Sequence, residues 1–491
     1  MPLSPSHFIR SILTLGAAQI LTWIGGAAMA VLLPRYLGDA NLGKVAFGLA
    51  FTALVGLVAD LGTATFLTKE VARNRERIAT LTINTLAMRV VLGGIGIASA
   101  VIGVNVATTD PVSREIVYVL SGGMLAIALS NAVVAALQGL QLIKALAVFS
   151  LVTKLGYAAI ALGALVGGAG PIEVAVAWVV SQTLGLLVVS VYLARAIGRH
   201  VRLVPDWPTL RLLFLGGLPF FVWQAALMVY GQVDAVLLSF LTQDAVVGWY
   251  SAAYRIVTIP LFLPTIIMTV IFPAMASTSG DTRQFSTIAR RAIHVVLLPS
   301  VPMVLGIILL ADKLIAFMGY PDAFEHSIAP MILLAPHIVL VGVNMVVGTV
   351  LQTRDLQRNW AIAGVVAAVL NPLLNLPAIT FSQAQFGNGA IGASVVTTLT
   401  EVFMLCAGLC LLPRGVLGRQ TAMDVTRCLA AGLVMAVAVV LGRSLPLVLD
   451  VALGALTYAV AAVAVGAVSV PELRQAVQLV LRREPAPQLA A

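Results

Sequence analysis

Long runs of apolar residues follow one another along the whole chain, separated by short polar segments. A helix needs about 20 apolar residues to cross the hydrocarbon core of a bilayer, and runs of this length are too long for strands. The pattern therefore predicts an all-α polytopic membrane protein with about fourteen transmembrane helices. The predicted spans are approximately 8–33, 45–67, 80–104, 115–137, 142–166, 172–196, 210–241, 246–275, 290–311, 328–352, 359–381, 389–412, 424–442 and 446–467.

The composition agrees with a membrane protein and excludes a soluble one. Hydrophobic residues make up 60% of the chain and charged residues only 10%, whereas average soluble domains carry about 25% charged residues. The net charge of +9 does not indicate a nucleic-acid partner, because most Lys and Arg residues lie in one set of alternate loops. Basic loops of this kind face the cytoplasm. We therefore expect a multi-pass membrane protein with both termini in the cytoplasm.

Three short segments recur in the same order in the two halves of the chain. The matched segments are Gly38–Phe47 with Gln243–Ala252, Leu137–Ala147 with Leu351–Ala361, and Gly170–Trp178 with Gly389–Thr397. Repeats of six spans face the same way and are related by an axis along the membrane normal. The predicted domains are an N-terminal pseudo-symmetric six-helix lobe at 1–200, a second lobe at 201–415, an additional helix pair at 416–469 and a cytoplasmic amphipathic tail at 470–491, with Val470–Arg483 along the membrane surface.

Six ionisable residues lie inside predicted spans, where a charged side chain costs roughly 2.5–3.5 kcal/mol on insertion scales. They are Asp60, Arg89, Lys154, Asp234, Arg255 and Glu401. Asp60 and Arg89 lie at similar depths on adjacent antiparallel spans. Asp234 and Arg255 do so as well, so each couple is either a structural ion pair or part of a functional cavity. Lys154 and Glu401 have no obvious partner nearby in the sequence and are the strongest candidates for contact with a substrate or an ion.

Amide side chains accompany these charges, and we expect them either to bond helices together or to bind sugar hydroxyls. The candidate cavity amides are Gln138, Gln352, Asn371 and Asn375. Asn371 and Asn375 are four residues apart and so share one face of a helix. Tyr250, next to Trp249, is predicted to anchor its helix at the membrane interface.

No pattern in the sequence indicates a cofactor, a metal or an enzyme active site. Cys406 and Cys410 are one helical turn apart in an apolar run, without the further Cys or His ligands of a zinc site. The segment Gly38–Val45 imitates a phosphate-binding loop, but Val45 replaces the Ser or Thr that holds magnesium. The longest predicted outer loop, 312–327, offers few polar groups for a membrane glycosyltransferase, polymerase or ligase. We therefore expect a transporter and not an enzyme.

Several segments resemble the polysaccharide-transport branch of the multidrug/oligosaccharidyl-lipid/polysaccharide exporter superfamily. They are PRYLGDANLGKVAF at 34–47, ADLGTATFLTKEVAR at 59–73, ALQGLQ at 136–141, and GLPFFVWQAALMVYGQVDAVLLSFLTQDAVVGWYSAAYRI at 217–256. The resemblance covers about residues 8–413. It implies two lobes arranged in a V, and a flippase of the bacterial inner (cytoplasmic) membrane. Such a flippase moves undecaprenyl-pyrophosphate-linked oligosaccharide, a surface polysaccharide precursor, to the outer leaflet by alternating access.

The resemblance also implies partners and site residues. In related flippases basic cavity residues hold the diphosphate, a role that would fall here to Arg89, Lys154 and Arg255. The implied partners are the lipid-linked oligosaccharide, the lipid bilayer, protons or sodium ions as coupling ions, and other polysaccharide-assembly proteins. The alternative is a proton- or sodium-coupled multidrug-type exporter of small amphipathic molecules. That branch commonly has an acidic residue in its first span, and residues 8–33 contain none.

Overall fold

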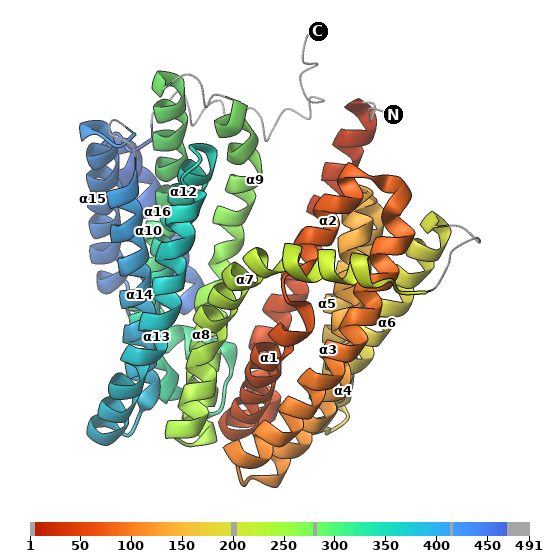
Figure 1. Cartoon of the computed structure of the whole chain (residues 1–491). Coiled ribbons are helices and arrows are strands. Elements are labelled where there is room, and N and C mark those ends of the chain that lie inside the picture. Colours follow the sequence, from red (N-terminus) through yellow and green to blue (C-terminus); the bar gives the residue numbers. More distant parts are fainter. Residues whose placement is uncertain (1–4, 198–203, 278–281, 413–415, 469–491) are drawn as a thin grey trace. The chain divides into compact units, whose positions relative to one another are not determined.

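The computed structural model describes residues 5–197, 204–277, 282–412 and 416–468, and no strand occurs in these ranges (Figure 1). The predicted surface helix at Val470–Arg483 lies outside the described residues. The α-helices and the short 3-10 segments follow the chain in the order α1 (Pro5–Asp60), α2 (Thr63–Arg73), η1 (Arg75–Arg77), α3 (Ile78–Ala107), α4 (Pro111–Gly139), α5 (Ile143–Val166), α6 (Pro171–Ile197), α7 (Trp207–Leu241), α8 (Asp244–Thr258), η2 (Ile259–Leu261), α9 (Phe262–Ser277), α10 (Thr282–Met318), η3 (Asp322–Ser327), α11 (Ile328–Leu334), α12 (His337–Thr353), α13 (Gln357–Phe386), α14 (Gly389–Leu411), α15 (Arg419–Leu441) and α16 (Leu447–Ala464).

The prediction of an all-α polytopic membrane protein is confirmed. By length and composition, 13 helices among the described residues are apolar enough to cross a membrane. The difference from the predicted fourteen lies in α1, which joins two predicted spans. The two parts meet at Gly38, where the backbone leaves the helical region with φ 72° and ψ 179°. A glycine suits this junction because its φ is positive.

Three predicted spans are interrupted by short breaks. Pro260 lies in η2, between α8 and α9, and Pro336 separates α11 from α12. Proline interrupts a helix because it has no N–H to donate to the preceding turn. The third break separates α1 from α2 at Leu61 and Gly62, whose φ angles are 43° and 70°. Two consecutive residues with positive φ cannot continue a right-handed helix.

Internal contacts divide the described residues into two compact units. The first unit draws on Met1–Ile259, Met318–Leu334 and Ala361–Met404, and the second draws on Pro260–Phe317, Ala335–Trp360 and Leu405–Ala491. The first unit therefore contains all of the predicted first lobe that is described, together with α7, α8, η3, α11 and the larger parts of α13 and α14. The division into lobes by chain order, at 1–200, 201–415 and 416–469, stays a prediction.

The predicted repeat reappears in the backbone of two turns, one after α4 and one after α12. In the first turn the N–H of Leu142 donates to the carbonyl of Leu137 (3.0 Å), and in the second the N–H of Leu356 donates to the carbonyl of Leu351 (2.8 Å). The residue before each donor has a positive φ, 61° and 60°, although neither is a glycine. Both turns are Schellman motifs. They occupy matching positions in a pair of repeated segments, which supports a duplication of the fold.

The helices α1 and α8 cross with a reciprocal contact (Figure 1). A Cβ added to Gly43 of α1 would lie 1.8 Å from the carbonyl oxygen of Asp244 on α8. A Cβ added to Gly248 of α8 would lie 2.0 Å from the carbonyl oxygen of Asp39 on α1. These four residues occupy matching positions in the first pair of repeated segments. The two glycines therefore allow the helix backbones to touch in a pseudo-symmetric crossing.

Polar side chains repeat the symmetry of this crossing. Lys44 of α1 lies 3.8 Å from the carboxylate of Asp244, and Trp249 of α8 donates from Nε1 to the carboxylate of Asp39 (3.0 Å). Lys44 also forms an ion pair with Asp110 at 2.9 Å. Partial burial raises the pKa of Asp110, but hydrogen bonds from Lys44 and from a backbone N–H outweigh it, so this pKa is below its ordinary value.

Gly43→Ala is expected to destabilise the folded protein by about 1–3 kcal/mol, because the added methyl group overpacks the crossing. Gly26→Ala is the matched control on the same helix, since a Cβ at Gly26 would meet nothing within 4 Å. Thermal unfolding of the two variants in detergent measures the difference. Equal melting temperatures would show that the two helices separate easily at this point.

Candidate functional site

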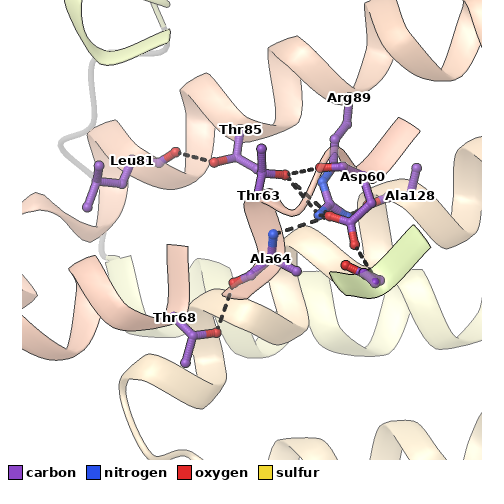
Figure 2. A network of polar contacts seen from close by, with 9 residues as sticks. Asp60, Thr63, Ala64, Thr68, Leu81, Thr85, Arg89 and Ala128 are labelled. Carbon is purple, nitrogen blue, oxygen red and sulfur yellow. Dashed lines mark hydrogen bonds and ion pairs between the residues drawn. The ribbon is translucent and has the colours of Figure 1, made fainter. Parts of the chain in front are cut away.

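Asp60 and Arg89 form a buried ion pair (Figure 2). Arg89 on α3 donates from Nη2 to the carboxylate of Asp60, the last residue of α1. The same guanidinium donates to the hydroxyl of Thr63 (3.1 Å) and to the carbonyl of Ala128 on α4. The side chain of Arg89 is completely buried, and that of Asp60 is 12% exposed. The pair therefore ties α1, α2, α3 and α4 together.

Asp60 also connects this network to α7. Its Oδ2 accepts a hydrogen bond from Nε2 of Gln224 (3.0 Å). Nearby, the break between α1 and α2 lies against the backbone of α7, since a Cβ on Gly62 would be 2.3 Å from the carbonyl oxygen of Gly217. The burial of Arg89 leaves its guanidinium no surface for a diphosphate. The geometry therefore favours the structural pairing of these charges over the expected substrate contact of Arg89.

Asp234 on α7 lies at the centre of a second buried cluster. Its carboxylate accepts hydrogen bonds from the hydroxyls of Tyr250 on α8 (2.6 Å) and Thr397 on α14 (2.7 Å), and from Nδ2 of Asn375 on α13 (2.8 Å). The interpretation of Asp234 and Arg255 as an ion pair is wrong for the described structure. The two α8 residues Tyr250 and Arg255 are five positions apart, so they point about 140° apart around the helix. Tyr250 is the one that faces Asp234.

A second layer of polar contacts lies one helical turn away from Asp234. Tyr230, four residues before Asp234, donates to the carboxylate of Glu401 on α14. Asn371, four residues before Asn375, accepts from its Nδ2 at 2.9 Å. Because each helix contributes residues four positions apart, the side chains stack in two layers on the facing sides of α7, α13 and α14. Asp234, Glu401 and both Asn residues thus belong to one cluster.

The prediction that Tyr250 anchors its helix at the membrane interface is wrong. Tyr250 is only 4% exposed, and its ring stacks on that of Tyr254 with 5.9 Å between the centroids. Its hydroxyl makes the shortest of the three hydrogen bonds to Asp234, at 2.6 Å. The buried tyrosine therefore belongs to the polar cluster, and the neighbouring Trp249 reaches the α1–α8 crossing instead.

The Asp234 cluster is suited to a proton or a small monovalent cation. Carboxylate, amide and hydroxyl oxygens are the ligands that hard cations prefer. Oδ1 of Asn375 is buried without a hydrogen-bond partner, and no basic side chain in the described ranges forms an ion pair with Asp234. The described residues contain no group of three or more His, Cys, Asp or Glu side chains that could hold a metal ion. A transition-metal centre is therefore not indicated by these residues.

Of the three basic residues expected deep within spans (Arg89, Lys154 and Arg255), Lys154 and Arg255 remain accessible. Lys154 on α5 is exposed, and Arg255 on α8 is half-buried. Tyr157, one turn after Lys154, lies within electrostatic range of Arg255. Neither cation forms an ion pair with an acidic side chain in the part of the chain that the structure describes. Their positive charges are therefore available to an anionic ligand.

Gln138 and Gln352 occupy matching positions in the two Schellman turns. Both side chains are exposed, and neither makes a hydrogen bond to another described residue. They are not members of the Asp60 or the Asp234 network, so their contact with a substrate stays a prediction. Sequence reasoning missed Thr397 and Tyr157. Thr397 lies one helical turn before Glu401 and Tyr157 lies one turn after Lys154, and this spacing could have identified both.

Comparison with known families identifies a matching model. The model described as polysaccharide biosynthesis protein matches residues 8–279.

Among curated proteins, the chain is 28% identical over 249 residues to the probable flippase AglR of Haloferax volcanii, a match that covers 47% of this chain and 49% of that protein. It is 24% identical over 286 residues to the lipid II flippase MurJ of Bacillus subtilis, covering 54% and 48%. A third relative, the probable low-salt glycan biosynthesis flippase Agl15 of Haloferax volcanii, is 27% identical over 35% of each chain. The matches thus span between a third and a half of the relatives' length.

Solved structures share the fold of most of the chain. A lipid II flippase MurJ in an inward closed conformation superposes with a TM-score of 0.74 at 14% identity, covering 92% of this chain and 98% of that one. An inward-facing multidrug resistance MATE family transporter of the MOP superfamily gives a TM-score of 0.66 at 15% identity, covering 82% and 98%. At these identities the likeness establishes the fold alone.

Proposed function

Because the chain belongs to the polysaccharide biosynthesis protein family, we propose that it is a flippase for lipid-linked oligosaccharide, the precursor of a surface polysaccharide. The cargo expected from the sequence is linked through undecaprenyl pyrophosphate, and the membrane is the bacterial inner membrane. Three curated relatives are named as flippases or probable flippases, and the fold matches that of solved transporters. These likenesses support transport and not catalysis.

The observation that carries the proposal is the pair of cations Lys154 and Arg255. Each would cost roughly 2.5–3.5 kcal/mol at membrane depth, and the described residues provide no carboxylate partner for either. Lysine binds phosphate as a compact charge and arginine binds it as a planar fork. A lipid diphosphate supplies the missing negative charge, while its polyprenyl chain stays in the bilayer.

The Asp234 cluster is the proposed site of ion coupling. Its oxygen ligands and the unpartnered Oδ1 of Asn375 suit a proton or a sodium ion. The cluster joins α7, α8, α13 and α14, so an ion bound there changes the contacts of four helices together. An ion gradient or the membrane potential would in this way drive the transport cycle.

The reciprocal crossing of α1 and α8 supports alternating access. Gly43 and Gly248 allow the two repeats to touch closely where α1 and α8 cross, and the predicted topology places this crossing on the outer side, with both termini in the cytoplasm. The contact would close the outer side while cargo is loaded from the cytoplasmic leaflet. It would have to separate when the cargo is released.

Lys154→Ala and Arg255→Ala are each expected to lower flipping of lipid-linked oligosaccharide at least about tenfold, because a charge-assisted hydrogen bond is lost. The protein should remain folded, since neither side chain forms an ion pair among the described residues. The measurement is flipping of a fluorescent lipid-linked oligosaccharide in proteoliposomes, with size-exclusion chromatography as the check on folding.

Arg73→Ala is the control for this experiment, because Arg73 is an exposed cation (65%) at the end of α2. It should flip the cargo like the wild type. Wild-type flipping by the Lys154 or the Arg255 variant would remove that residue from the site. Resistance to amphipathic drugs on overexpression, without glycan flipping, would instead support the multidrug-type alternative.

A further inference from the structure

A row of alternating cations and tyrosines extends beyond the proposed cargo site. Lys154 lies one turn from Tyr157 on α5, and Arg255 lies within electrostatic range of both Tyr157 and Tyr320. Tyr320 also interacts with Arg35, near the predicted outer end of the first span. In the order of predicted depth, the row begins near the middle of the membrane and ends at the outer surface.

Arg35 is held in place but keeps free hydrogen-bond donors. Its Nε and Nη2 donate to the carbonyl of Met318 at 3.2 and 2.6 Å. The guanidinium lies against Gly319, where φ is 61° and an added Cβ would be 2.5 Å from Nη2. An arginine has five N–H donors, so three remain available. The side chain is exposed, and these donors can reach a ligand.

The positive charge of Arg35 is not neutralised by the acid one turn along α1. Asp39 accepts hydrogen bonds from the indole of Trp249 (3.0 Å) and from the N–H of Ala40 (2.8 Å). No carboxylate in the described ranges forms an ion pair with Arg35. A guanidinium that is fixed, exposed and unneutralised suits the oxygens of a phosphate or diphosphate.

Tyr320 lies within electrostatic range of both Arg35 and Arg255. Its side chain is 8% exposed, and its hydroxyl donates to the carbonyl of Ala30 at 2.6 Å. Burial raises the pKa of Tyr320 to about 12, although Arg255 and Arg35 lower it. The hydroxyl therefore stays protonated near neutral pH and can exchange its carbonyl acceptor for a phosphate oxygen. An anion leaving Arg255 would meet this donor before it reaches Arg35.

We propose that Arg35 is a second anion-binding residue, which receives the diphosphate headgroup of the cargo from Arg255, past Tyr320, before release on the outer side. The proposal rests on the proposed function, because the direction of movement and the nature of the anion follow from it. The residue contacts the cargo through its three remaining N–H donors. Its bond to Met318 keeps the guanidinium in position.

Binding of inorganic diphosphate to the purified full chain, measured by titration calorimetry, tests the proposal. Arg35→Gln is expected to weaken binding about tenfold or more, through the loss of a charge-assisted hydrogen bond. Arg114→Gln is the matched control, since Arg114 also lies at the predicted outer end and donates to the carbonyls of Thr108 (2.8 Å) and Asn105 (3.2 Å). It should bind like the wild type. Wild-type affinity in Arg35→Gln would overturn the proposal.

Chemical modification of the wild-type protein gives an answer even if Arg35→Gln fails to fold. Inorganic diphosphate should protect Arg35 from phenylglyoxal several-fold more than it protects Arg114, as read by mass spectrometry. Equal protection of the two arginines contradicts the proposal. Farnesyl diphosphate should protect Arg35 more strongly than inorganic diphosphate if the ligand is a lipid headgroup, and weaker protection would rule out the cargo as its source. None of these measurements needs transport, so a chain that binds diphosphate at Arg35 and flips no glycan would refute the proposed function alone.

Discussion

Replacing Arg89 with methionine is expected to destabilise the folded protein by about 3–5 kcal/mol, because it leaves the carboxylate of Asp60 as an uncompensated buried charge. Arg89 is completely buried, and its guanidinium bonds to Asp60, Thr63 and Ala128 at once. The variant should therefore lose the connection between α3 and the break that follows α1. Thermal unfolding in detergent and the yield of monodisperse protein measure the effect.

A double substitution distinguishes the effect of an unpaired charge in this network from the effect of lost packing. Asp60→Asn combined with Arg89→Met removes both charges, and the carbonyl of the new amide can still accept the hydrogen bond of Gln224. Breaking one partner of a buried pair is costly, whereas replacing both is often nearly neutral. The double variant should recover most of the lost stability. A single Arg89→Met variant that is stable but flips cargo poorly would instead identify Arg89 as a cargo contact.

Hydropathy predicted the helices, and the depths that it assigns to residues predicted one of the two ion pairs. Hydropathy depends on residues that are close in the chain, so span limits can be read locally. Asp60 and Arg89 lie at similar depths on adjacent spans, and they do meet in the structure. Depth alone does not determine which face of a helix a residue occupies. The same argument therefore failed for Asp234 and Arg255.

Tertiary contacts decided the features that the sequence could not show. The aromatic ring of Tyr250 is typical of an interfacial anchor, but the buried carboxylate of Asp234 uses its hydroxyl as a donor. Leu61 adopts a positive φ that few non-glycine residues take, because the break containing it lies against α7. Thr397 carries no charge and so was not among the expected ionisable candidates, although it contacts Asp234 directly.

Asp234→Asn is expected to abolish gradient-driven flipping, lowering the rate at least about tenfold, because the amide removes the only negative charge in the first layer of the cluster. A neutral amide in place of a carboxylate loses charge-assisted hydrogen bonds worth roughly 1.5–3 kcal/mol each and cannot hold a cation by charge. The shape of the side chain is kept, so the protein should remain folded. Flipping in proteoliposomes with and without an imposed sodium or proton gradient gives the measurement.

Asp110→Asn is the control for this variant, since Asp110 is a hydrogen-bonded carboxylate outside the buried cluster. It should retain flipping that responds to the gradient.

A ligand that binds only the folded state raises its melting temperature, so sodium should stabilise the wild type more than Asp234→Asn if sodium is the coupling ion. If sodium stabilises neither protein while flipping still follows a proton gradient, the coupling ion is the proton. Gradient-driven flipping at the wild-type rate by Asp234→Asn would show that the coupling ion binds elsewhere, and the buried cluster would then have only the structural role of joining α7 to α8, α13 and α14.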